Sequence, residues 1–226
     1  SEYLTRDRIR IGAWVSPNQE AIGKDFIETY RSGGFDWIIA HGALAGSENR
    51  KMLLTDCDRY GVELILGDGA YKDSAVATAE YFDHPCFAGT YVTDEPGTDQ
   101  YDKLAVICNA YYKETGGKLP YVNLLPMYAN AAQLKYGASA AAIEYYDPDP
   151  ALYKKYCDAF CRKFDAPYIC TDIYPLNWAK GRRTTYRDYC ESIHVIAASA
   201  REHGKDFWCC IQTFAWVPSK RTPTES

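Results

Sequence analysis

Short apolar runs alternate with longer amphipathic stretches along almost the whole chain. Each run is nearly uninterrupted by polar residues, which is typical of strands in a parallel sheet that is covered on both faces. The predicted strands span 9–16, 35–42, 62–69, 86–95, 119–128, 166–176 and 206–216. The predicted helices between them span 18–32, 47–60, 73–82, 99–115, 150–164 and 185–203. This regular alternation predicts an α/β fold.

The strand ends separate two α/β architectures. A doubly wound sheet usually carries a glycine-rich phosphate turn after its first strand, whereas "WVSPNQE" at 14–20 has no such glycines. Polar and aromatic residues gather instead at the C-terminal end of nearly every predicted strand, as on the active face of a TIM (β/α)8 barrel. They are Trp14, His41, Asp68, Asp94, Glu95, Asn123, Asp172, Tyr174, Gln212 and Trp216. The sequence therefore predicts a TIM barrel.

The predicted barrel stops one strand short. After the seventh strand the chain continues with "VPSKRTPTES" at 217–226, which is too short for a helix and an eighth strand, and a TIM barrel usually has ~250 residues. We therefore expect residues 1–226 to form a single (β/α) barrel catalytic domain, truncated after strand 7 and lacking its C-terminal helix and strand.

Net charge and hydrophobicity argue against two classes of partner, nucleic acids and membranes. The net charge is −5, and basic residues cluster only in the short "KGRR" at 180–183, so we expect no nucleic-acid partner. No apolar run approaches the ~20 residues of a membrane span, so we expect no membrane insertion.

The nine cysteines form no paired CxxC framework, and most lie within apolar runs or helical patterns. Free cysteines of this kind favour a reducing, cytoplasmic location; a secreted protein whose signal peptide lies outside this sequence is the alternative. Cys157 and Cys161 are four residues apart on a predicted helix, but no second pair of ligands lies nearby. We expect neither a metal nor a cofactor.

Two adjacent carboxylates, Asp94 and Glu95, end the fourth predicted strand in "GTYVTDEPGT" at 89–98. A neighbouring negative charge and a low dielectric raise the pKa of a carboxyl group, so that it keeps its proton at a higher pH than in water. A protonated carboxyl group can act as general acid towards a glycosidic oxygen. Side chains alternate along a strand, so both can face one site only if the backbone turns at Pro96. The structural alternative is a solvated loop carboxylate or a helix N-cap.

The other strand-end residues also have two interpretations each. Asp172 either supplies a second catalytic carboxylate or caps a turn, and Asn123 either holds a sugar hydroxyl or caps its loop. Asp68 lies between two glycines, where an Asx-turn is the structural interpretation. Strand-end tryptophans either stack on sugar rings or fill the core. The predicted substrate-binding residues are Trp14, His41, Asp68, Asn123, Tyr174, Gln212 and Trp216.

Four blocks of sequence carry a family resemblance. "YVTDEPG" at 91–97 resembles the strand-four acid/base motif of clan A glycoside hydrolases, usually Asn-Glu-Pro. With "YVNLLPMYAN", "ICTDIYPL" and "DFWCCIQTFAW" in that order, the chain resembles bacterial barrel proteins identified as glycoside hydrolases and related to β-galactosidase-type enzymes. The resemblance covers strands one to seven and implies a glycan-active barrel with Glu95 as acid/base.

The chain departs from that clan at two positions. Asp94 stands where the clan has Asn, and the seventh strand offers Gln212 where the clan has a nucleophilic Glu. No acidic residue lies between Asp206 and Glu225. The second carboxylate is then Asp172, or Asp94 orients a substrate acetamido group that serves as internal nucleophile, as in some glycosidases.

Three functions follow from these patterns. The first is a glycoside hydrolase acting on O-glycosidic bonds of oligo- or polysaccharides, with a carbohydrate as its partner and Glu95 as general acid/base. The second is a non-catalytic carbohydrate-binding barrel, which the missing strand-seven Glu supports. The third is a barrel enzyme on another small polar substrate, such as an aldolase, although no strand-end Lys is placed for a Schiff base and no late phosphate-binding glycines are visible.

Overall fold

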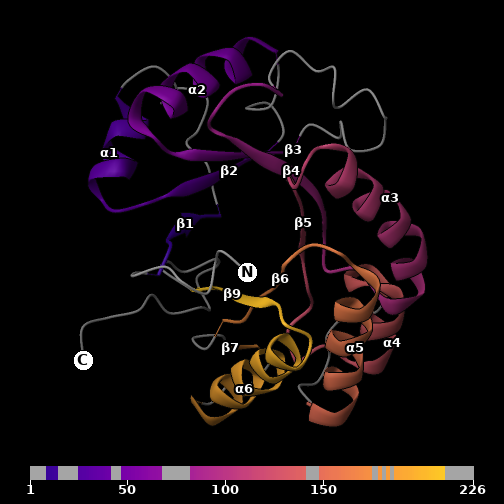
Figure 1. The fold of residues 1–226 in the computed structure, drawn as a ribbon. Coiled ribbons are helices and arrows are strands. Elements are labelled where there is room, and N and C mark those ends of the chain that lie inside the picture. The colour runs from indigo at the N-terminus through magenta and orange to yellow at the C-terminus, as the bar shows by residue number, and fades with distance from the viewer. Residues whose placement is uncertain are drawn as a thin grey trace. The chain divides into compact units, whose positions relative to one another are not determined.

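A computed structural model describes residues 9–14, 25–41, 47–67, 82–140, 148–174, 178–179, 182–183 and 186–211 (Figure 1). The strands are β1 (Gly12–Ala13), β2 (Trp37–His41), β3 (Glu63–Gly67), β4 (Phe87–Asp94), β5 (Leu119–Asn123), β6 (Tyr168–Asp172), β7 (Trp178–Ala179), β8 (Arg182–Arg183) and β9 (Asp206–Cys210). The α-helices are α1 (Phe26–Ser32), α2 (Ser47–Tyr60), α3 (Tyr101–Glu114), α4 (Ala131–Tyr136), α5 (Pro150–Lys163) and α6 (Tyr186–Glu202), and two 3-10 helices are η6 (Thr98–Gln100) and η7 (Ala138–Ala140).

The strand order follows the chain order. One parallel sheet runs β1-β2-β3-β4-β5, β6 pairs in parallel with β9, and Leu124 just after β5 forms a parallel bridge with Thr171 of β6. A doubly wound sheet reverses its strand order at a switch point, and this order has no reversal among the described strands. The predicted parallel α/β fold is confirmed.

The chain divides into two compact units: Ser1–Val92 with Val106–Tyr121, and Thr93–Ala105 with Val122–Ser226. We call them the first and the second unit. β4 and β5 begin in the first unit, and their last residues belong to the second. That residues 1–226 form one barrel domain stays a prediction.

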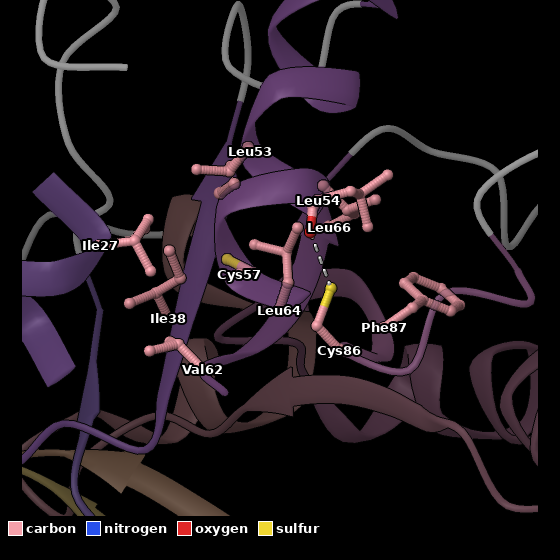
Figure 2. Close-up of a cluster of buried hydrophobic side chains, with 11 residues drawn as sticks. Ile27, Ile38, Leu53, Leu54, Cys57, Val62, Leu64, Leu66, Cys86 and Phe87 are labelled. Carbon is pink, nitrogen blue, oxygen red and sulfur yellow. Dashed lines mark hydrogen bonds between the residues drawn. The ribbon is translucent and has the colours of Figure 1, made fainter. Parts of the chain in front are cut away.

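The first unit has its core between the sheet and the helices α1 and α2. Alternate residues of β2 and β3, such as Ile38 and Leu64, point to these helices and pack with Leu53 and Cys57 of α2 (Figure 2). Aromatic rings occupy the other face of the sheet, where Tyr121 of β5 lies 6.3 Å from the ring of Trp37 of β2. Alternation along β2 therefore places Ile38 towards the helices and Trp37 on the opposite face.

The second unit is built around α5. The buried rings of this helix include Tyr153, Tyr156 and Phe160, and Phe160 stacks on Phe164 at 4.1 Å. The Lys205 ammonium donates to the carbonyl oxygens of Phe164 and Ala166 at 2.7 and 2.6 Å, which satisfies backbone acceptors between the end of α5 and β6.

Several details differ from the pattern-based elements. α4 and the antiparallel pair β7–β8 were not predicted, and β1 is shorter than its predicted run. Residues 18–24 and 73–81 of two predicted helices lie outside the described ranges. Within those ranges no helix has the length and apolarity needed to cross a membrane.

Candidate active site

Three neighbouring strands end within the second unit on polar residues that the sequence had singled out. β4 ends at Asp94, β5 at Asn123 and β6 at Asp172. Backbone hydrogen bonds hold the three ends in register, because the Glu95 amide donates to the Asn123 carbonyl at 2.8 Å and the Leu124 amide to the Cys170 carbonyl at 2.9 Å. The polar side chains therefore meet at one edge, where the parallel strands finish.

The Asn123 side chain joins the two aspartates. It is fully buried, and its Nδ2 atom donates to Oδ1 of Asp94 at 3.0 Å and to Oδ1 of Asp172 at 2.8 Å. A side-chain amide has two N–H donors, so each carboxylate takes one. Because both bonds share the Nδ2 atom, the distance between Oδ1 of Asp94 and Oδ1 of Asp172 cannot exceed the sum of the two bond lengths. Charge-assisted hydrogen bonds of this kind offset the repulsion between the aspartates.

Glu95 has an unusual backbone. Its φ is 47°, in the left-handed region that non-glycine residues seldom adopt and that is enriched at functional sites. Two hydrogen bonds hold this conformation: the Glu95 amide donates to the Asn123 carbonyl, and the Ala138 amide donates to the Glu95 carbonyl at 3.1 Å. This is the backbone turn needed to free Glu95 from strand alternation.

The turn after Glu95 is tightly packed. A Cβ atom added to Gly97 would lie 2.3 Å from the backbone nitrogen of Gly137 and 2.3 Å from the carbonyl oxygen of Lys135, so only glycine fits there. The Gly97 amide donates to Oε1 of Gln100 at 2.8 Å. The Tyr156 hydroxyl of α5 donates to the Pro96 carbonyl at 2.7 Å. Glu95 is therefore carried by a turn that is fixed on several sides.

The carboxyl cluster consists of Asp94, Glu95 and Asp172, and the pKa values of Glu95 and Asp94 are raised. Burial, and then the charges of Asp172 and Asp94, raise the pKa of Glu95 to about 8. Partial burial raises the pKa of Asp94 to about 6, although its side chain keeps an exposed surface; the Asn123 bond opposes this rise and Asp172 adds to it. At pH 7 Glu95 is mostly protonated and Asp94 mostly ionised. The cluster thus holds a proton donor beside a carboxylate.

Tyr174 follows β6 and is half-buried. Burial, and then the adjacent Asp172 carboxylate, raise the pKa of its hydroxyl well above the usual value, so the hydroxyl keeps its proton at any pH the protein would meet. Within the described ranges no three His, Cys, Asp or Glu side chains are grouped to hold a metal ion.

Two of the other predicted residues belong to the first unit. Trp14 belongs to the first unit, where its ring lies 6.1 Å from Tyr91 and 5.8 Å from Tyr121. His41 is the last residue of β2, in the same unit. Asp68, Gln212 and Trp216 lie outside the described residues.

Two residues that shape the cluster were missed. Tyr156 is one of twenty tyrosines and sits within an ordinary amphipathic helix, so no local signal singles it out. Gly97 follows Pro96 and was read only as the end of a strand, although a Pro-Gly pair before a helix is also a sign of a tight turn.

Comparison with known proteins identifies the fold class. No protein-family model matches the sequence, and no curated protein matches it. A candidate alpha-L-fucosidase from Bacteroides thetaiotaomicron is similar in structure with a TM-score of 0.59 at 12% identity, over 90% of this chain and 76% of that one. An HpcH/HpaI aldolase from Desulfitobacterium hafniense DCB-2 is similar with a TM-score of 0.55 at 9% identity, over 93% and 81%. The chain therefore has a TIM-barrel-like α/β fold.

Proposed function

We propose that the protein is a glycoside hydrolase in which Glu95 is the general acid/base. The observation that carries this proposal is that Asn123 bridges Asp94 and Asp172 at the strand ends, directly beside the left-handed turn at Glu95. The raised pKa of Glu95 agrees with this geometry. Glycosidases need a carboxylic acid that is protonated at working pH and a second carboxylate close by. Glu95 and the two aspartates would fill these two roles at the strand ends, where TIM-barrel enzymes have their active sites.

The acid acts on the leaving group. As the glycosidic C–O bond breaks, its electron pair goes to the leaving oxygen, and Glu95 gives that oxygen its proton. The sugar ring then carries positive charge, which the nearby side chains of Asp94 and Asp172 stabilise. A water oxygen then bonds to the anomeric carbon while Glu95, now a carboxylate, takes a proton from that water.

Two routes remain for the second carboxylate. Asp172 attacks or stabilises the anomeric carbon directly, or Asp94 orients an acetamido group of the substrate that attacks in its place. Asn123 contacts both aspartates, so it would orient whichever one acts. A substrate panel with and without a 2-acetamido group separates the two routes.

The fold alone does not specify glycoside hydrolysis. The two similar structures are named for different reactions, a fucosidase and an aldolase, and one barrel fold supports many chemistries. The choice of a glycoside rests on the carboxyl cluster, and the likeness to a fucosidase is consistent with it.

The test is hydrolysis of a panel of aryl and natural glycosides by the wild-type chain and by Glu95→Gln. Loss of the acid should lower turnover of natural glycosides by ~10²–10⁴-fold, and much less for aryl glycosides whose leaving groups need little protonation. Glu191→Gln, on the exposed side of α6 in the same unit, is the matched control and should keep full activity. Sugar binding without hydrolysis would support the binding-protein alternative instead.

A further inference from the structure

One buried hydroxyl connects the turn that carries Glu95 with the strand that carries Asn123. Tyr156 of α5 is 2% exposed. Its hydroxyl donates to the Pro96 carbonyl at 2.7 Å and accepts from the Leu125 amide at 3.1 Å. Pro96 follows Glu95 directly, and Leu125 is two residues beyond Asn123. A single side chain therefore fixes the spacing between the two backbones.

This link matters because the turn is strained. Glu95 has a φ of 47°, and such a conformation persists only where the surroundings over-determine it. Its own backbone hydrogen bonds reach Asn123 and Ala138. The Pro96 carbonyl is the next hydrogen-bond acceptor along the turn, and it accepts from the Tyr156 hydroxyl of helix α5.

The ring of Tyr156 is packed independently of its hydroxyl. It lies 5.5 Å from the ring of Tyr101 and is stacked at 6.1 Å on Tyr153 of the same helix. Replacement by Phe keeps these contacts and removes the bonds to both backbones. The buried Pro96 carbonyl and Leu125 amide would then lose their partner, which costs more than the bond itself.

We propose that Tyr156 is a positioning residue for the acid/base Glu95, acting through the Pro96 carbonyl to hold the acid in the carboxyl cluster. The role of Glu95 as acid/base rests on the proposed function, whereas the positioning of Glu95 by Tyr156 does not. Without this bond the turn relaxes and Glu95 moves away from the cluster towards water.

The consequence is measurable on Glu95 itself. The ionisable groups that act on it are Asp94 and Asp172, at the ends of β4 and β6, and its charge is felt in turn by Tyr156 of α5. Movement away from the two aspartates and out of the buried site lowers the pKa of Glu95 towards its ordinary range. We expect a decrease of ~1 unit or more in Tyr156→Phe, the size of effect that a nearby charge or burial produces.

The experiment is a titration of the Glu95 side-chain carboxyl by ¹³C NMR in the wild-type chain, Tyr156→Phe and Tyr153→Phe. Tyr153 is the matched control because it is also buried on α5 and its hydroxyl contacts Thr171 at 3.4 Å rather than the turn. Tyr153→Phe should lose stability and leave the pKa of Glu95 unchanged. An unchanged pKa in folded Tyr156→Phe, or equal decreases in both variants, would overturn the inference.

A second variant covers the case in which Tyr156→Phe does not fold. 4-Aminophenylalanine at position 156 keeps a donor for Pro96 but is a poor acceptor for Leu125, so the pKa of Glu95 should stay near the wild-type value; a decrease would contradict the role of the donor bond. Glycoside hydrolysis is measured in parallel. A Tyr156-dependent pKa with no wild-type hydrolysis refutes the proposed function alone, and hydrolysis with a Tyr156-independent pKa refutes this inference alone.

Discussion

Glu95 makes folding depend on pH in a direction opposite to that of most carboxylates. Its pKa is raised from an ordinary 4.5 to about 8, so the folded chain binds this proton more tightly than the unfolded chain does. The free energy of unfolding therefore keeps its full value below about pH 4.5 and falls as the pH rises towards 8. Replacement by Gln removes the charge and with it this loss.

The magnitude follows from the size of the shift. One pKa unit corresponds to ~1.4 kcal/mol, so the full shift sets an upper limit of about 5 kcal/mol. Glu95 is only partly buried and water screens part of the interaction, so we expect about 2–3 kcal/mol. Glu95→Gln should equal the wild type near pH 4.5 and exceed its free energy of unfolding by that amount at pH 9.

Urea unfolding between pH 4.5 and 9, followed by circular dichroism, measures this difference. Glu191→Gln is the control, because this exposed α6 residue should give a curve parallel to that of the wild type. If the free energy of unfolding of Glu95→Gln also runs parallel to that of the wild type from pH 4.5 to 9, Glu95 has an ordinary pKa in the folded chain and is not a neutral acid at pH 7.

Two further substitutions test the packing of the site. Asn123→Leu should lower the free energy of unfolding by ~3 kcal/mol, because two charge-assisted bonds are lost while the volume is kept. The loss should shrink below about pH 6, where Asp94 becomes protonated. A pH-independent loss in urea unfolding would contradict the charge-assisted bond between Asn123 and Asp94. Gly97→Ala should destabilise by ~2 kcal/mol or more, because its Cβ would lie 2.3 Å from backbone atoms. Gly61→Ala, with a φ of 66° but nothing within 4 Å, should cost ~1 kcal/mol, and equal thermal shifts in the two variants would refute the steric argument.

The sequence was informative where a signal is local. Helix α2 was predicted with the observed bounds, because its periodic apolar positions end at Gly61. Of the strands that end on Asp94, Asn123 and Asp172, only β4 was predicted to end within a residue of its observed end. The predicted fifth and sixth strands ran on to 128 and 176, because apolar residues such as Leu124 and Ile173 follow Asn123 and Asp172. The α4 helix was missed although a capping box is present, in which Asn130 accepts from the Gln133 amide.

The contacts that make the site were not readable, because they join residues distant in sequence. The amide of Asn123 lies 29 residues from Asp94 and 49 from Asp172, and no periodicity specifies such a bridge. The positive φ of Glu95 is also a tertiary effect, since Glu has no intrinsic preference for that region. Sequence reasoning required a turn at this point but could not say which residue would take the strain.

The division of the chain has a consequence for its synthesis. Each described strand of the first sheet pairs with the next one along the chain, so β1, β2 and β3 can associate as soon as they leave the ribosome. The first unit nevertheless includes Val106–Tyr121, and thus most of β5. A nascent chain that has reached only residue 92 still has β4 as an open edge, and such edges recruit other strands. We therefore expect chaperones to bind the nascent chain in the interval before β5 emerges, and ribosome profiling of chaperone binding should show an occupancy that falls once Tyr121 has cleared the exit tunnel.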